Sequence, residues 1–217
     1  MKHSQSKTHV EQFLRHLSPP LDPAPLLQRL ETFVQILLKH AERRDLLSAS
    51  QRNPAAAWSH VLDCLQPLAF PSLAEAEWLI DAGSGGGLPG IPLAIALPGA
   101  KVQLVERSSS KAEFLELAKG LVPLTNVEIK TRELEESIGA APANSIFVAR
   151  ALAQPAKWKD LLRKSESIPS WIIFATAHNQ LEWTEAAEAC GLSLTATHAY
   201  VLPESPGNRI LLQFSPH

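Results

Sequence analysis

The stretch Asp81-Ala-Gly-Ser-Gly-Gly-Gly-Leu-Pro-Gly90 is the clearest indication of the architecture, because it joins a short apolar segment at 78–81 to a helical pattern near 91–97. Five glycines within its last eight residues let the backbone turn sharply and approach a ligand closely. Amides at the start of the helix would point at that ligand. The sequence therefore predicts a binding loop at the carboxyl end of a strand in an open α/β sheet.

The segments after this loop alternate between short apolar runs and helical patterns. We predict strands at 78–81, 101–106, 127–130, 145–149 and 171–175, with helices between them. One of these helices is predicted to begin at a serine within 108–110 and to end at Gly120. The alternation is typical of a mainly parallel sheet with helices on both faces. Segments 192–201 and 209–214, joined only by the loop 203–208, predict an antiparallel pair that completes the sheet.

The first quarter of the chain predicts helices only. Apolar residues recur at helical spacing from Val10 to Leu17 and again from Leu26 to Ala41. Asn53-Pro54 has the form of an N-cap followed by proline at the first helical position. We therefore divide the chain into a helical N-terminal extension, residues 1–70, and a Rossmann-like domain, residues 71–217.

Composition excludes several classes of protein. The 217 residues are 45% hydrophobic, which excludes a disordered chain, and only two are cysteines, which excludes a disulfide scaffold. The two cysteines form no CxxC pair, so we predict no metal site. No segment reaches the roughly 18 apolar residues of a membrane span, and the first 17 residues lack the apolar core of a signal peptide. We expect a cytoplasmic protein with no membrane partner.

Two ligands are compatible with the glycine loop. From Gly85 the pattern Gly-x-Gly-x-x-Gly matches the dinucleotide fingerprint of oxidoreductases, with Glu106 as the ribose partner. From Asp81 the pattern Asp-x-Gly-x-Gly-x-Gly is that of S-adenosylmethionine-dependent methyltransferases. The second is favoured because the strand ends directly at Asp81, because prolines at 89 and 92 stiffen the stretch where a pyrophosphate needs free amides, and because the last strand is antiparallel. A nucleotide-dependent oxidoreductase is the alternative.

Several stretches together resemble one family, the bacterial 16S rRNA guanine-N7 methyltransferases, also called glucose-inhibited division protein B. The matching stretches are Asp81 to Leu93 with its Leu-Pro-Gly-Ile-Pro extension, Leu104-Val-Glu106, Arg132-Glu-Leu-Glu135, Val148-Ala-Arg150-Ala151 and His60-Val-Leu-Asp63-Cys-Leu65. The resemblance implies a class I methyltransferase fold that binds S-adenosylmethionine. It implies as substrate a guanine in the decoding-region loop of the small-subunit rRNA.

The resemblance also implies which residues form the site. It implies S-adenosylmethionine contacts at Gly83, Leu88, Glu106, Glu133, Leu134 and Arg150. We expect Asp81, Ser84, Gly85, Gly87 and Arg107, which lie in or beside the same motifs, to bind S-adenosylmethionine as well. Arg150 is further expected to be catalytic, because its planar fork suits either the methionine carboxylate or guanine O6. Guanine N7 carries an unprotonated lone pair and the donor is a sulfonium, so no general base is expected and catalysis rests on positioning.

The RNA-facing residues are predicted mainly from charge. Residues 1–60 carry eight Lys and Arg against five Asp and Glu, so the front end suits an anionic partner. We expect 16S rRNA in the small ribosomal subunit to be bound by a monomer through Lys39, Arg43, Arg44, Arg52, Lys111 and His178. His178 alternatively caps the following helix, and Arg43 and Arg44 are alternatively ordinary surface charges.

Three stretches depart from the family pattern. Residues 44–48 replace an Asn-Leu-Thr-like segment, Ser59 replaces an arginine that many members have, and His178-Asn179 replaces Lys-Gly. These departures motivate a second alternative, a relative that binds RNA or a partner but transfers no methyl group.

Overall fold

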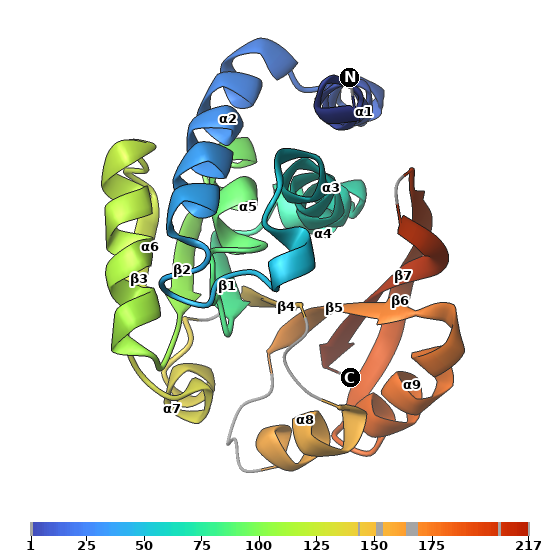
Figure 1. Ribbon diagram of the computed structural model, residues 1–217. Coiled ribbons are helices and arrows are strands. Elements are labelled where there is room, and N and C mark those ends of the chain that lie inside the picture. Colours follow the sequence, from blue (N-terminus) through green and yellow to red (C-terminus); the bar gives the residue numbers. More distant parts are fainter. Residues whose placement is uncertain (1, 143, 151–153, 164–168, 204, 217) are drawn as a thin grey trace.

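The computed structural model describes residues 2–142, 144–150, 154–163, 169–203 and 205–216. In this part of the chain, seven strands form one sheet in the order β3-β2-β1-β4-β5-β7-β6 (Figure 1). The strands are β1 Trp78–Ala82, β2 Lys101–Val105, β3 Val127–Lys130, β4 Ser145–Ala149, β5 Ser170–Thr176, β6 Leu192–Leu202 and β7 Ser205–Pro216. Strands β1 to β5 are parallel, whereas β7 is antiparallel to both β5 and β6. The predicted fold class, with its antiparallel C-terminal pair, is confirmed.

Two details of the predicted strands are wrong. The expected loop 203–208 is shorter, because β7 begins at Ser205 and its pairing with β6 extends to Leu202 opposite Ser205. Glu106 lies just beyond β2 rather than in it, because β2 ends at Val105. That position directs the Glu106 carboxylate toward the loop after β1, to which it is hydrogen-bonded.

Helices cover both faces of the sheet (Figure 1). The helices are α1 Lys2–His16, α2 Pro23–His40, α3 Pro54–Leu65, α4 Pro71–Ala74, α5 Gly90–Ala96, α6 Ser109–Leu121, α7 Leu134–Gly139, α8 Pro155–Leu162 and α9 Gln180–Glu188, with 3-10 turns η1 Ala49–Gln51, η2 Gln66–Ala69 and η3 Ala177–Asn179. Residues of α1 to α6 build one hydrophobic core, and residues of α7, α8 and α9 build the other.

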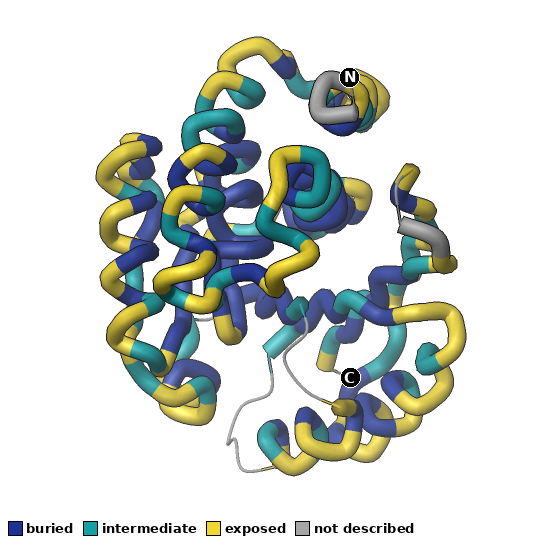
Figure 2. The backbone as a smooth tube through the Cα atoms, viewed as in Figure 1, coloured by how far each residue is buried: buried dark blue, intermediate teal, exposed yellow. Residues whose placement is uncertain are grey.

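Side chains of the central strands alternate between these two cores. Leu79 of β1 and Val148 of β4 lie in the core under the N-terminal helices. Their neighbours Ile80 and Phe147 lie in the opposite core. Because both faces are covered, β1 and β4 are buried along almost their whole length, and exposed residues gather on the outer sides of the helices (Figure 2).

The N-terminal helices share their core with the sheet. Leu14 of α1 and Phe33 of α2 belong to the same buried cluster as Leu79 and Leu104 of the strands. The division of the chain into residues 1–70 and 71–217 stays a prediction. Buried side chains of both segments pack into one hydrophobic core. The predicted start of α3 is confirmed, because the Asn53 side chain accepts a hydrogen bond from the Ala56 amide at 3.0 Å.

α6 starts where predicted, with Ser108 at the N-cap position, although the Ser108 side chain makes no capping hydrogen bond; only the end of the helix differs from the prediction. The Ser108 amide instead donates to the Glu106 carboxylate at 2.8 Å. Gly120 lies inside the helix, which continues to Leu121.

At Gly90, the first residue of α5, helix and sheet approach too closely to leave room for a side chain. A Cβ added there would lie 2.2 Å from Leu104 Cδ2 and 2.6 Å from Asp81 Oδ2, whereas a Cβ on Gly120 would meet nothing within 4 Å. We expect Gly90→Ala to lower the free energy of unfolding by about 1–3 kcal/mol or more through overpacking. Gly120→Ala is the control and should raise it by up to about 1 kcal/mol. Denaturant titrations of both variants measure this, and equal stabilities would contradict the packing described.

Candidate functional site

The glycine loop after β1 is held by backbone hydrogen bonds at the end of β2. The amides of Gly83 and Ser84 both donate to the Val105 carbonyl, at 3.1 and 2.9 Å. Gly83, Gly85 and Gly87 have φ values of 79°, 52° and 80°. Side chains disfavour such values, so the backbone path itself requires glycine at every second position.

The Glu106 carboxylate holds the glycine loop in place through hydrogen bonds to backbone amides. One of its carboxylate oxygens accepts from the Gly85 amide at 2.9 Å, and the other accepts from the Ser108 amide at 2.8 Å. The residue is only 8% exposed. Because a carboxylate has about four acceptor positions, each oxygen keeps the capacity for a further donor such as a ligand hydroxyl.

Asp81 is a buried carboxyl group at the end of β1. Its Oδ2 accepts from the Gly90 amide at 2.9 Å, which joins the end of the strand to the start of α5. Its Oδ1 has no hydrogen-bond partner within the described ranges. Burial raises the pKa of Asp81 from 3.8 to about 7, against the opposing effect of hydrogen bonds from Ser84 and Gly90.

Two hollows flank the loop. The larger, of about 710 Å³, is lined by Gly83, Ser84, Gly85, Gly86 and Leu88, by residues 45–48 and Gln51 opposite them, by Arg150, and by residues of α3, β5, β6 and β7. The second, of about 400 Å³, is lined by Gly83, Glu106, Arg107, Glu133 and Leu134, together with residues of α8. Both volumes suit a small-molecule ligand, and both hollows share Gly83.

Most of the predicted cofactor residues therefore lie around one continuous region. Gly83, Ser84, Gly85, Leu88 and Arg150 line the larger hollow, and Glu106, Arg107, Glu133 and Leu134 line the second. Asp81 and Gly87 line neither hollow. Asp81 instead holds the start of α5, and the Gly87 amide donates to the Ser84 carbonyl at 2.7 Å, so both shape the loop from behind.

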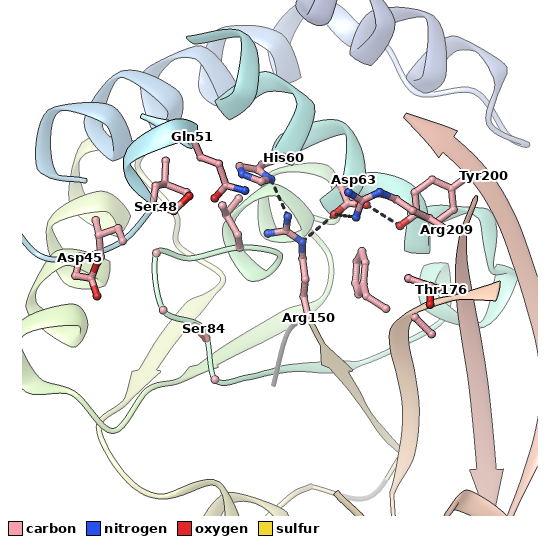
Figure 3. A pocket seen from close by; sticks show the side chains of 18 of the residues that line it. Asp45, Ser48, Gln51, His60, Asp63, Ser84, Arg150, Thr176, Tyr200 and Arg209 are labelled. Carbon is pink, nitrogen blue, oxygen red and sulfur yellow. Dashed lines mark hydrogen bonds and ion pairs between the residues drawn. The ribbon is translucent and has the colours of Figure 1, made fainter. Parts of the chain in front are cut away.

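Arg150, directly after β4, is the centre of a polar cluster in the larger hollow (Figure 3). Its Nε donates to Asp63 Oδ2 at 2.8 Å, and its Nη2 donates to His60 Nδ1 at 2.7 Å. Asp63 also accepts from the Tyr200 hydroxyl at 2.7 Å and lies 3.5 Å from Arg209 Nη1. α3 and the consecutive strands β6 and β7, which are distant from β4 in sequence, thus meet at the end of β4.

Sequence reasoning missed most of this cluster. His60 and Asp63 belong to a stretch that resembles the family, but no role was predicted for them, and Tyr200 and Arg209 were not singled out. One signal was present, because a spacing of three residues places His60 and Asp63 on the same face of a helix. Tyr200 is the only tyrosine of the chain, which is a weaker signal.

His60 is a neutral ring in this cluster. Burial, followed by the charge of Arg150, lowers its pKa to about 4. Because arginine can only donate, His60 Nδ1 must accept, and the ring proton lies on Nε2. That Nε2 is buried without a hydrogen-bond partner in the described structure.

The residues predicted to bind RNA lie outside both hollows. Lys39, Arg43 and His178 are exposed. Arg44 donates to the Ser110 carbonyl and pairs with Glu113, and Arg52 donates to the Leu47 carbonyl and lies 3.6 Å from Glu42. Lys111 is partly buried at the start of α6. Their role in RNA binding stays a prediction.

The alternative role predicted for His178 is wrong. The capping hydrogen bonds at this point are made by Thr176 and Asn179, which form a capping box around η3. Asn179 and Thr176 line the larger hollow, whereas His178 does not.

The segment that departs from the family pattern forms one wall of the larger hollow. Asp45, Leu46, Leu47 and Ser48 line it. Leu46 packs close to the loop, since a Cβ on Gly86 would lie 3.3 Å from Leu46 Cβ. This wall therefore faces whatever the glycine loop binds.

In the described part of the chain, no group of three or more His, Cys, Asp or Glu side chains is placed to hold a metal ion. No helix in the same part is both long and apolar enough to cross a membrane.

A family model described as rRNA small subunit methyltransferase G, GidB, matches residues 26–206. The chain belongs to this family. The ribosomal RNA small subunit methyltransferase G of Solibacter usitatus is 33% identical over 165 residues, which cover 73% of this chain and 76% of the relative. The protein of that name from Sorangium cellulosum is 40% identical over 115 residues, which cover 52% of this chain and 47% of the relative. The chain thus matches about half the length of the second relative.

Solved structures share the fold. The magnesium protoporphyrin IX methyltransferase of Synechocystis with bound S-adenosylhomocysteine aligns with a TM-score of 0.55 at 15% identity, covering 85% of this chain and 100% of that one. The match to the family model and to the curated relatives confirms the family that was identified from the sequence motifs. It confirms a methyltransferase with S-adenosylmethionine as donor, rather than an oxidoreductase.

The raised pKa of Asp81 predicts a pH-dependent stability. The folded protein keeps a proton that the unfolded chain has lost between about pH 4 and pH 7, so this contribution is full below pH 4 and is lost as the pH rises through 7. Asp81→Asn removes the titration. We expect the stability of the variant, relative to the natural protein, to increase by about 2 kcal/mol between pH 5.5 and pH 8, at about 1.4 kcal/mol per pKa unit. Urea titrations at both pH values measure this, and a difference that does not change with pH would contradict it.

Proposed function

We propose that this protein transfers the methyl group of S-adenosylmethionine to N7 of a guanine in 16S rRNA, acting as a monomer on the small ribosomal subunit in the cytoplasm. The observation that carries the proposal is the glycine loop between two hollows that meet at Gly83, in a chain of the small-subunit rRNA methyltransferase family. Family membership supports the enzyme class and the donor. The guanine N7 atom is the finer step, supported by the resemblance of the motifs.

The residues of the second hollow fit the adenosine part of the donor. The Glu106 carboxylate keeps acceptor capacity for ribose hydroxyls after binding the two amides of the loop and of α6. Leu134 and Leu161 give the same hollow apolar walls, which suit an adenine ring. The exposed pair of Arg107 and Glu133, 3.9 Å apart, borders it.

Arg150 fits the charged end of the donor. Its guanidinium has five N–H groups, of which one is bound by Asp63 and one by His60, so three are available toward the larger hollow. The side chain is 18% exposed. We assign these groups to the methionine carboxylate, because opposite charges in a partly buried site attract strongly.

The chain needs to supply no base for this reaction. When bound, S-adenosylmethionine supplies a methyl group on a positively charged sulfur, and guanine N7 is already an unprotonated nucleophile. The work of the protein is therefore to orient the two reactants and to exclude water. Phe174, which lines the larger hollow, offers an aromatic face on which a guanine ring can stack.

Methyl transfer and donor binding test the proposal directly. We expect labelled methyl to pass from S-adenosylmethionine to guanine N7 in small-subunit particles that lack this modification. Glu106→Gln should weaken S-adenosylhomocysteine binding about ten- to hundredfold, because hydrogen bonds to a charged group contribute about 1.5–3 kcal/mol. Glu128→Gln, which removes an acid outside both hollows, is the control. Calorimetry measures both variants.

Two results would contradict this function. Tight NADH binding without S-adenosylmethionine binding would favour the oxidoreductase. Donor and RNA binding without any transfer would favour the silent relative.

RNA binding is expected to depend on salt through exposed cations. Lys39 and Arg43 lie just before residues 45–48, which form one wall of the larger hollow. Replacing both by alanine should flatten the slope of log affinity against log salt by about 1.4, at about 0.7 per phosphate. Lys101→Ala is the control, because Lys101 begins β2 and so lies at the sheet edge opposite the loop. Filter binding at several salt concentrations measures the slopes, and equal flattening by the control would contradict this interface.

A further inference from the structure

Asp63 is a buried carboxylate shared by residues from three other parts of the chain. The side chain is 1% exposed. It accepts from Arg150 at the end of β4 and from Tyr200 on β6, and it lies 3.5 Å from Arg209 on β7 (Figure 3). Burying a charge is costly unless it is paired, so the cluster is held together by the groups that surround this carboxylate.

The contacts of Arg150 fix the direction of its guanidinium. Asp63 binds Nε and His60 binds Nη2, which are two separate atoms of one planar fork. Two such anchors define both the plane of the fork and its rotation about the side-chain axis. The remaining N–H groups then have fixed directions at the larger hollow, which Arg150 lines.

The other groups of the cluster keep the carboxylate itself in place. Burial, followed by the negative charge of Asp63, raises the pKa of Tyr200, so its hydroxyl stays protonated and donates. The lowered pKa of His60 keeps its ring neutral and able to accept from Arg150. Asp63 lies closer to Arg150, at 2.8 Å, than to Arg209, at 3.5 Å, so Arg150 is its main ionic partner.

We propose that Asp63, held in place by Tyr200 of the C-terminal strand pair, is the positioning residue that orients Arg150 for the methyl donor. His60 completes the orientation as a neutral acceptor. The proposal rests on the proposed function of Arg150 in donor binding. It gives the antiparallel strand pair a part in the site, although the pair lies outside the parallel sheet.

A double-variant cycle separates positioning from a merely structural role. We expect Asp63→Asn to weaken S-adenosylhomocysteine binding about tenfold, the equivalent of one hydrogen bond to a charged group. Arg150→Gln should weaken it by the same factor or more. The double variant should bind no more weakly than Arg150→Gln alone, because Asp63 acts through Arg150. Calorimetry measures all four proteins, and losses that multiply in the double variant would overturn the proposal.

A control variant shows whether lost stability alone weakens binding. Asn126→Ala removes hydrogen bonds to the carbonyls of Ala94, Leu97 and Ala100, outside the larger hollow. It should lower the melting temperature while leaving affinity within twofold. If Asp63→Asn loses no more affinity than this control, the proposal fails.

Tyr200→Phe keeps the test falsifiable if Asp63→Asn does not fold. It removes only the hydroxyl that donates to Asp63 and keeps the ring. We expect about a threefold loss of affinity that disappears in the Arg150→Gln background. A loss that persists there would overturn the proposal.

A spectroscopic measurement tests the orientation without reference to function. The Nε–H signal of Arg150, identified by its absence in Arg150→Gln, should exchange with water at least tenfold more slowly than those of exposed arginines, because Asp63 holds it. Tyr200→Phe should speed that exchange. A protein that binds no donor yet shows slow Nε–H exchange would refute the proposed function and keep the positioning. Fast exchange in the natural protein would refute the positioning itself.

Discussion

The hydrogen bond from the Gly90 amide to Asp81 Oδ2 is the constraint on which the site depends. It ties the end of β1 to the start of α5 at 2.9 Å, so residues 82–89 must close within a very short span. The closure is possible because position 90 has no side chain and because alternate loop residues adopt positive φ. It also requires burying a carboxyl group, whose pKa rises in consequence. The shape of the loop is thus obtained at the expense of an unfavourable buried acid.

The sequence predicts the local features of this arrangement well, because they depend on neighbouring residues. The apolar runs of β1 to β5 and the Asn53-Pro54 helix start are written in consecutive residues. The turn between β6 and β7 was misplaced because proline and glycine at 203–207 indicate a loop, whereas strand pairing resumes at Ser205. The residue types in a turn do not by themselves show how far the hydrogen-bonded pairing of two strands extends.

The cluster around Asp63 could not be predicted for the opposite reason. Arg150 and Tyr200 lie 87 and 137 residues from Asp63 in sequence, and only the strand order brings them to one place. β4 lies next to β1 in the sheet, and α3 packs on the sheet face that carries Leu79 and Val148. The stretches where the chain departs from the family pattern also lie at this end, since residues 45–48 line the larger hollow and Ser59 lines a neighbouring one. The glycine-loop side of the site thus follows the family motifs, whereas the wall opposite it departs from them.

The strand pair that supplies Tyr200 has a consequence for the newly made polypeptide. α3 leaves the ribosome long before β6, because 137 residues separate Asp63 from Tyr200. At about 5–20 residues per second, roughly 7 to 27 seconds pass between the synthesis of the two. Arg150 is also made before Tyr200, so its two anchors, Asp63 and His60, are present before the tyrosine that holds Asp63. The cluster around Asp63 is therefore complete only when the final strands have joined the sheet.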